Sequence, residues 1–167
     1  MAQDRATPPK QPSRVREMFD AIAFRYDLAN AVLSLGLHRY WRHLAAGRIR
    51  GGVVVDLCTG TGDLARCLAA RREVELLIGV DFSRSMLWHA QRKLKRKVSL
   101  MQGDAMRLPL PSSIVDYITI GFGLRNLVDP VAGLAEMRRV VKKSGRVIIL
   151  EFGRLPQSAW GRTFAMY

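Results

Sequence analysis

The segment VVVDLCTGTGD, residues Val53–Asp63, decides the fold of this chain. Its apolar, β-branched first half predicts a buried strand, and Asp63–Ala70 has the pattern of a helix. Gly60 and Gly62 let the turn between them approach a ligand closely, because no Cβ intervenes. The first turn of the helix would then present N–H groups to a carboxylate or a phosphate. The spacing matches neither GxGxxG nor a P-loop, so a purely structural turn stays open as the alternative.

Strand and helix patterns continue to alternate after this turn. Further strands are expected at Leu76–Val80, Val98–Met101, Val115–Ile120 and Arg146–Phe152, and further helices at Ser83–Lys95 and Val131–Val141. Strands separated by helices form βαβ units with right-handed crossovers. The pattern therefore predicts an α/β fold in which helices cover both faces of a parallel, doubly wound sheet.

The chain before the first strand is organised differently. Residues 1–13 are polar, contain proline and are expected to be a disordered tail. Residues 14–52 have helical spacing, with one helix over His38–Ile49, and are interpreted as a lid. Phe19 and Tyr26 would close over a ligand in this lid, although plain packing uses the same aromatic spacing. Residues 53–167 would form the ligand-binding domain.

Charge and composition narrow the class of protein. Lysine and arginine outnumber aspartate and glutamate by 27 to 14, a net charge of +13 over 167 residues, which favours an anionic partner. No apolar run reaches the ~20 residues of a membrane-spanning helix. The N-terminus lacks the apolar core of a signal peptide, so a cytoplasmic location is expected. Two cysteines fit neither a disulfide framework nor a zinc cluster, and no metal is expected.

Two acidic positions extend the site along the edge of the sheet. Asp81 ends the second predicted strand, where it can accept hydrogen bonds from both hydroxyls of a ribose. Its alternative role is to cap the helix that begins near Ser83. Asp104, with the backbone of Ala105, could bind an adenine, or could simply form a turn. Together with the glycine turn, these residues describe a site for an adenosine with a carboxylate-bearing tail.

Several motifs resemble those of known methyltransferases. The glycine turn and GVDFSRSM (79–86) are similar to the first motifs of class I S-adenosylmethionine-dependent methyltransferases. DAIAFRYDLANAVLSLGLHRYW (20–41), FGLRN (122–126), EMRRV (136–140) and LEF (150–152) resemble the UbiE/MenG family of menaquinone/ubiquinone biosynthesis C-methyltransferases. The resemblance implies a Rossmann-like fold that uses S-adenosylmethionine. The cofactor-binding residues that the turn and the resemblance together predict are Asp56, Gly60, Thr61, Gly62, Asp81, Asp104, Ala105 and Gly121. Cys58-Thr59 departs from the small residues usual there, and Cys58 would crowd the cofactor tail.

The resemblance implies methyl transfer from a sulfonium to a ring carbon of a demethylated polyprenyl quinol. A phenol titrates near pH ~10, so a base, a bound water or a cation must favour the phenolate. Arg125 is the candidate cation, with bonding to loop carbonyls as its structural alternative. His38 is a second candidate, because imidazole titrates near neutral pH, and a structural bond at a helix end is its alternative.

The family's fold continues through two more strands, so this chain is expected to be a fragment that lacks them. Its apolar fifth strand would keep an open edge, which predicts a homodimer or an aggregate. Basic clusters at Arg92–Lys97 and Arg138–Lys143 predict peripheral contact with an anionic membrane surface, or are solvated helix faces. No nucleic acid is expected as a partner. Two other functions stay open: an inactive cofactor-binding remnant or scaffold subunit, and a methyltransferase for RNA or another small molecule.

Overall fold

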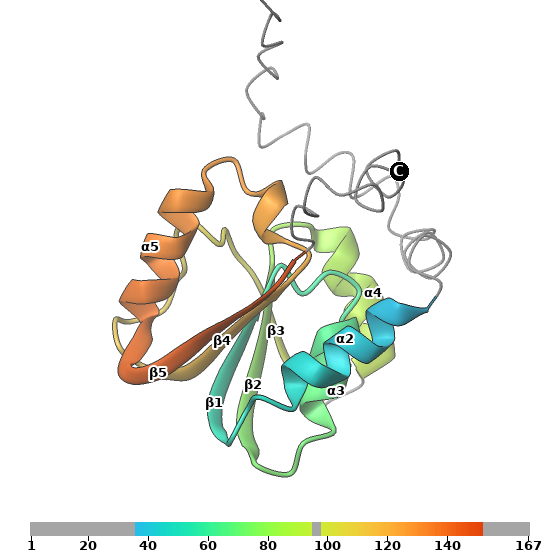
Figure 1. Ribbon diagram of the computed structural model, residues 1–167. Helices are drawn as coiled ribbons and strands as arrows, with labels where there is room; N and C mark the ends of the chain where they lie inside the picture. The colour runs from blue at the N-terminus through green and yellow to red at the C-terminus, as the bar shows by residue number, and fades with distance from the viewer. Residues whose placement is uncertain (1–35, 95–97, 152–167) are drawn as a thin grey trace, which may run out of the picture.

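A computed structural model describes residues 36–94 and 98–151 of the chain (Figure 1). The helices are α2 (Leu37–Ala46), α3 (Asp63–Ala69), α4 (Arg84–Leu94), the short 3-10 helix η1 (Leu124–Asn126) and α5 (Pro130–Val140). The strands are β1 (Gly52–Leu57), β2 (Val74–Asp81), β3 (Ser99–Gln102), β4 (Val115–Gly121) and β5 (Val141–Leu150). The predicted tail and the lid residues Phe19 and Tyr26 lie outside the described residues.

The five strands form one parallel sheet in the order β3-β2-β1-β4-β5. Leu57 at the end of β1 is in register with Val80 of β2 and Ile120 of β4, so the carboxyl ends of these strands meet at one edge. From β1 the chain adds β2 and β3 toward one edge of the sheet, and it then returns to add β4 and β5 toward the other edge. The order of the strands therefore changes direction between β1 and β4. In open α/β sheets, ligands bind beside the carboxyl ends of the strands at such a switch point.

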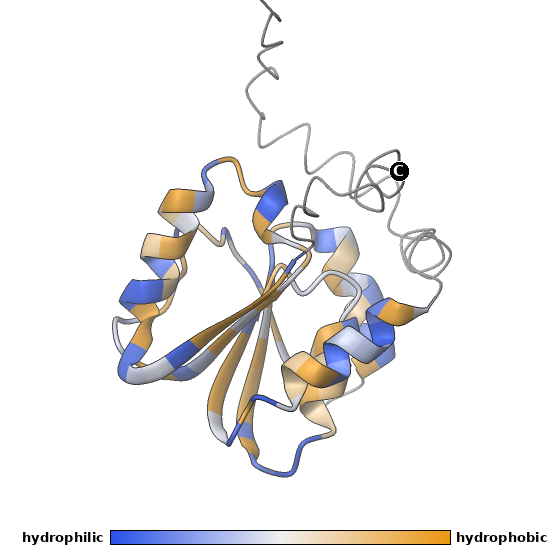
Figure 2. Cartoon of the chain, viewed as in Figure 1, coloured by the Kyte–Doolittle hydropathy of each residue, from blue (hydrophilic) through white to orange (hydrophobic). Residues whose placement is uncertain are grey.

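Helices cover both faces of this sheet, as the sequence predicts (Figure 1). Val54 of β1 packs with α2, α3 and α4 on one face, whereas Val55 and Leu57 pack with Met137 of α5 on the other. Alternate residues of a strand point to opposite faces, so a strand buried on both sides must be apolar at nearly every position. Figure 2 shows this apolar character along the central strands. The Rossmann-like α/β fold class is therefore confirmed.

The end of α5 differs from the sequence prediction. The helix ends at Val140 and β5 begins at Val141, five residues before the expected start at Arg146. The pairing with β4 shifts between Val115 and Tyr117, where Val115 pairs with Val141 and Tyr117 pairs with Arg146. The extra residues, which include polar Lys142–Gly145, hide the start of the strand from a search for apolar runs.

One edge of the sheet, within the described residues, lies at β5. Within the described parts of the chain, β5 pairs with β4 on one side only. Ile149 on this strand is 44% exposed. An unpaired apolar edge is a template for pairing with another chain. Self-association through this edge stays a prediction.

Candidate functional site

A pocket opens at the carboxyl ends of the strands. It contains seven of the eight predicted cofactor-binding residues, namely Asp56, Gly60, Thr61, Asp81, Asp104, Ala105 and Gly121. Residues separated by up to 65 positions in the sequence therefore converge on one cavity. The eighth, Gly62, is not among the lining residues.

Gly62 adopts a backbone φ of +86°, which is unfavourable for residues with a side chain. A Cβ on Gly62 would lie 2.7 Å from Cδ1 of Leu94, so glycine lets the start of α3 pack against α4. Its contact with a cofactor stays a prediction, because the structure explains the residue by packing.

Asp81 is buried at the end of β2 and lines the pocket. Its Oδ2 accepts a hydrogen bond from the Gly60 N–H at 2.8 Å, and its Oδ1 accepts one from the Ser83 N–H at 2.9 Å. The helix cap is Ser83, whose Oγ accepts from the Met86 N–H at 3.2 Å. The alternative role of Asp81 as the helix cap is thus filled by Ser83, and Asp81 instead joins the glycine turn to β2.

The turn after β3 forms the neighbouring wall of the pocket. The Gly103 N–H donates to the Asp81 carbonyl at 3.0 Å, which ties this turn to the end of β2. Oδ1 of Asp104 accepts from the Met106 N–H at 2.8 Å. This local bond fixes the turn that places Asp104 and Ala105 at the pocket. The turn and the site interpretations are therefore compatible.

Asp56 forms the floor of the pocket between β1 and β4. Its carboxylate accepts hydrogen bonds from Oγ1 of Thr59 at 2.7 Å and Oγ1 of Thr119 at 2.6 Å. Burial raises the pKa of Asp56 to about 6, although both hydroxyl bonds and the charge of Arg42 act in the opposite direction. This carboxylate is 1% exposed, and it holds two neighbouring strands together as well as lining the cavity.

The cationic wall of the pocket, formed by Arg42 and supported by Lys93, does not follow from the sequence patterns. Arg42 on α2 is buried, with Nη1 3.1 Å from Oδ2 of Asp63. Lys93 reaches the same residue from α4, with Nζ 2.6 Å from Oδ1 of Asp63, and also donates to Oγ1 of Thr61 at 3.2 Å. Burial alone would raise the pKa of Asp63. The Lys93 hydrogen bond and the charges of Lys93 and Arg42 outweigh burial and hold this pKa below its usual range. No spacing in the sequence indicates this meeting, because Arg42 and Lys93 reach Asp63 from two different helices.

The FGLRN segment closes the pocket after β4. Phe122 has a φ of +57°, and its ring lies 6.5 Å from the ring of Trp41 and 5.7 Å from the guanidinium of Arg42. A Cβ on Gly123 would lie 2.6 Å from the Cβ of Cys58, so the cysteine in the glycine turn requires glycine here. Burial raises the pKa of the Cys58 thiol, which is therefore neutral at physiological pH. Crowding of a cofactor tail by Cys58, which lines the pocket, stays a prediction.

Neither predicted catalytic residue is among those lining the pocket. Arg125 lies in η1, with Nη1 3.4 Å from Oε1 of Glu151, and its backbone N–H donates to Oε2 of Glu151 at 3.3 Å. His38 is buried near the start of α2. The structure gives Arg125 a structural partner, but its loop neighbours Phe122 and Asn126 do line the pocket. The catalytic roles of both residues stay predictions.

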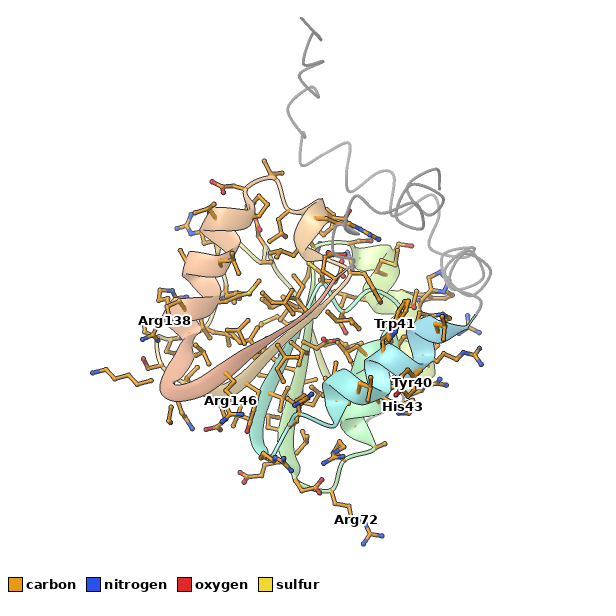
Figure 3. The ribbon with its side chains drawn as sticks, in the orientation of Figure 1. Tyr40, Trp41, His43, Arg72, Arg138 and Arg146 are labelled. Carbon is orange, nitrogen blue, oxygen red and sulfur yellow. The ribbon has the colours of Figure 1, made fainter. Side chains whose placement is uncertain are left out.

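Some residues of the predicted basic clusters form hydrogen bonds within the protein. Arg139 donates to both carboxylate oxygens of Glu136 at 2.7 Å and to the Leu110 carbonyl at 2.9 Å. Lys142 donates to Asp116 at 2.8 Å. Arg138 is exposed on α5 (Figure 3). In the parts of the chain that the structure covers, no helix is both long and apolar enough to cross a membrane.

The parallel sheet and the pocket at its switch point are those of a Rossmann-like α/β fold. The fold matches that of a Thermotoga maritima protein described as a SAM-dependent methyltransferase, with a TM-score of 0.71 and 24% identity over 91% of this chain and 68% of that chain. The profile of the ubiE/COQ5 methyltransferase family matches residues 8–167. The chain belongs to this family.

Curated relatives agree with this assignment. A ubiquinone/menaquinone biosynthesis C-methyltransferase from Geotalea uraniireducens is 40% identical over 83% of this chain and 63% of the relative. A demethylmenaquinone methyltransferase from Deinococcus radiodurans is 43% identical over 92% of this chain and 66% of the relative. The chain thus spans a little less than two thirds of the length of both relatives. The resemblance seen in the sequence motifs is confirmed at the level of the family.

Proposed function

We propose that this chain is the cofactor-binding part of an S-adenosylmethionine-dependent C-methyltransferase that acts on a demethylated polyprenyl quinol in quinone biosynthesis. Family membership and the names of the two relatives support this reaction. The observation that carries the proposal is the bond between Gly60 and Asp81. It joins the glycine turn and the strand-end acid into a single wall of the pocket, and an acid at this place can accept hydrogen bonds from ribose hydroxyls.

The residues of the pocket fit the parts of the cofactor. Asp104 and Ala105 would hold the adenine, and Asp81 would accept hydrogen bonds from the ribose hydroxyls. The backbone of Gly60 and the end of β4 at Gly121 would lie beside the aminoacyl tail. The pocket supplies acidic groups after β2 and β3 and a buried guanidinium on α2, which suits a zwitterionic tail on an adenosine.

S-Adenosylmethionine supplies an electrophilic methyl group when it is bound. The protein must then align the acceptor and favour its phenolate. Arg125 is the proposed cation, because a guanidinium stays charged and can stabilise an oxyanion or orient a water. His38 is the second candidate. The position of Arg125 in the loop that closes the pocket supports its role, whereas its ion pair with Glu151 supports a structural one.

Binding and turnover test this proposal separately. Calorimetry on the purified full chain should show binding of S-adenosylhomocysteine. Incubation with methyl-labelled S-adenosylmethionine and a demethylated quinol in detergent should then yield a product one methyl group heavier. Binding without product would favour the cofactor-binding remnant or scaffold. Labelling of added RNA instead of the quinol would favour another acceptor, and absence of binding would overturn the proposal.

A lipid substrate also implies contact with a membrane. The exposed face of α5 carries Val131 (75% exposed), Leu134 (40% exposed) and Arg138, an apolar and basic combination suited to an anionic interface. We therefore propose peripheral association from the cytoplasmic side. Cosedimentation with vesicles that contain anionic lipid should exceed that with neutral vesicles, and should fall in Arg138→Glu.

A further inference from the structure

Arg42 has a buried guanidinium that its protein partners do not fully satisfy. Its side chain is 8% exposed and lines the pocket. Nη1 lies 3.1 Å from Oδ2 of Asp63, but among residues 36–94 and 98–151 it has no hydrogen-bond partner of good geometry. Buried polar groups in native proteins are nearly always hydrogen-bonded, and buried charges are paired. Nη1 of Arg42 is ion-paired but not hydrogen-bonded within the described residues, so the guanidinium has a donor available to a ligand group inside the pocket.

The charges around Arg42 define the sign of that ligand group. Asp63 is also bonded to Lys93 at 2.6 Å, so two cations converge on one carboxylate. Asp81 and Asp104 also line the pocket, as does the buried Asp56 between β1 and β4. The cavity therefore has an acidic wall after β2 and β3 and a cationic wall at α2. An anionic group is favoured at the α2 wall.

The position of Arg42 relates it to the tail of the proposed cofactor. Its nearest pocket neighbours are Asp63, which follows β1, and Phe122, which follows β4. The ribose acid Asp81 ends β2, which is the strand next to β1. Arg42 contacts Asp63 at the end of the glycine turn, and Gly60 in the same turn is bonded to Asp81, so the turn connects the guanidinium to the ribose acid.

We propose that Arg42 binds the carboxylate of the aminoacyl tail of S-adenosylmethionine. A guanidinium and a carboxylate pair through two parallel hydrogen bonds, which gives both charge and orientation. This role rests on the proposed function, because it presumes that the pocket holds this cofactor. Arg42 also packs against Phe122, so the tail, α2 and the loop after β4 meet at one residue.

Ligands with and without the carboxylate provide the test. Calorimetry would compare S-adenosylhomocysteine, its decarboxylated analogue, which keeps the amine, and 5′-methylthioadenosine, which lacks the tail. In the unmodified protein, removal of the carboxylate should weaken binding at least ~10-fold, as expected for the loss of a charge-assisted bond. Arg42→Gln should weaken the binding of S-adenosylhomocysteine by a similar factor. It should change the affinity for 5′-methylthioadenosine less than ~3-fold. The affinity of Arg42→Lys for S-adenosylhomocysteine should lie between those of the unmodified protein and Arg42→Gln, because lysine keeps the charge but loses the planar fork.

Arg39→Gln is the matched control, since Arg39 is an exposed arginine on the same helix. It should leave all three affinities unchanged. Equal affinities of the unmodified protein for S-adenosylhomocysteine and the decarboxylated analogue would overturn the role of Arg42 without any variant. Parallel losses for all ligands in both Arg42 variants would also overturn it, by showing a structural role. Failure of the unmodified protein to bind S-adenosylhomocysteine at all would instead refute the proposed function.

Discussion

The backbone N–H of Gly60 donates a hydrogen bond of 2.8 Å to Oδ2 of Asp81. This bond spans 21 residues and connects the turn after β1 to the end of β2. Gly60 has a φ of +57°, and the bond holds its amide toward the neighbouring strand. The shape of the turn therefore depends on the carboxylate of Asp81, and the two sequence motifs act as one structural unit.

Asp81→Ala should weaken the binding of S-adenosylhomocysteine at least ~10-fold, because the ribose hydroxyls lose a charged acceptor. Calorimetry measures this loss directly. Glu75→Gln is the control, since it removes an exposed carboxylate from the opposite end of the same strand. An Asp81→Ala protein that folds and binds with unchanged affinity would exclude Asp81 from the site.

Asp56 should make stability depend on pH. Its pKa is raised from 3.8 to about 6 by burial, so the folded protein binds this proton more tightly than the unfolded chain does. The stability due to protonated Asp56 is thus lost as pH rises from about 4 to about 6. The free energy of unfolding of Asp56→Asn, relative to the unmodified protein, should rise by about 2 kcal/mol between pH 4 and 7. Urea unfolding at both pH values checks this, and a constant difference would contradict it.

Gly62→Ala should destabilise the fold through two effects. The left-handed backbone at φ +86° disfavours alanine, and the new Cβ would lie 2.7 Å from Cδ1 of Leu94. The close contact with Leu94 should lower the free energy of unfolding by ~1–3 kcal/mol beyond the cost of the left-handed backbone. Gly36→Ala separates the two effects, because Gly36 has a φ of +81° and nothing within 4 Å of its Cβ position. Chemical unfolding should show the larger loss in Gly62→Ala; equal losses would mean that Leu94 moves aside freely.

Arg139→Gln should lower the free energy of unfolding, because it breaks bonds to Glu136 and to the Leu108 and Leu110 carbonyls. The hydrogen bond from Arg139 holds the pKa of Glu136 below its usual range, which shows how directly the two groups interact. The neighbouring Arg138→Gln removes the same charge from an exposed position and should change stability little. Urea unfolding of both variants tests the difference, and similar losses would refute the internal role of Arg139.

Arg125→Lys should lower the rate of methyl transfer while the affinity for S-adenosylhomocysteine stays the same. Lysine keeps the charge but loses the planar fork that would orient a water or an oxyanion. Rates and affinities would be measured on the same preparations. Equal rates would leave Arg125 with its structural pairing to Glu151 alone.

The sequence was informative where chemistry depends on local pattern. The strand and turn at Val53–Asp63 and the acid at Asp81 follow from residue type and spacing, and the structure brings them together. The bulge at the start of β5 did not follow, because a polar segment that pairs irregularly has no period to detect. As a result, β5 begins at Val141, five residues before the start that the sequence predicts.

The cationic wall could not be predicted from spacing. Arg42 and Asp63 are 21 residues apart, and Lys93 is 30 residues further along the chain. Their meeting depends on how α2 and α4 pack against the start of α3, which only the tertiary structure defines. Gly62 shows the opposite case: the sequence assigned it to a ligand, whereas the packing of Leu94 accounts for it.

The strand order has a consequence for synthesis on the ribosome. β1, β2 and β3 are made consecutively, but β1 lies between β2 and β4 in the finished sheet. From the emergence of Leu57 to that of Gly121, 64 residues later, the second edge of β1 has no native neighbour to pair with. At ~5–20 residues per second, this interval lasts roughly 3 to 13 s. The nascent chain therefore keeps this apolar strand edge without its native neighbour for seconds.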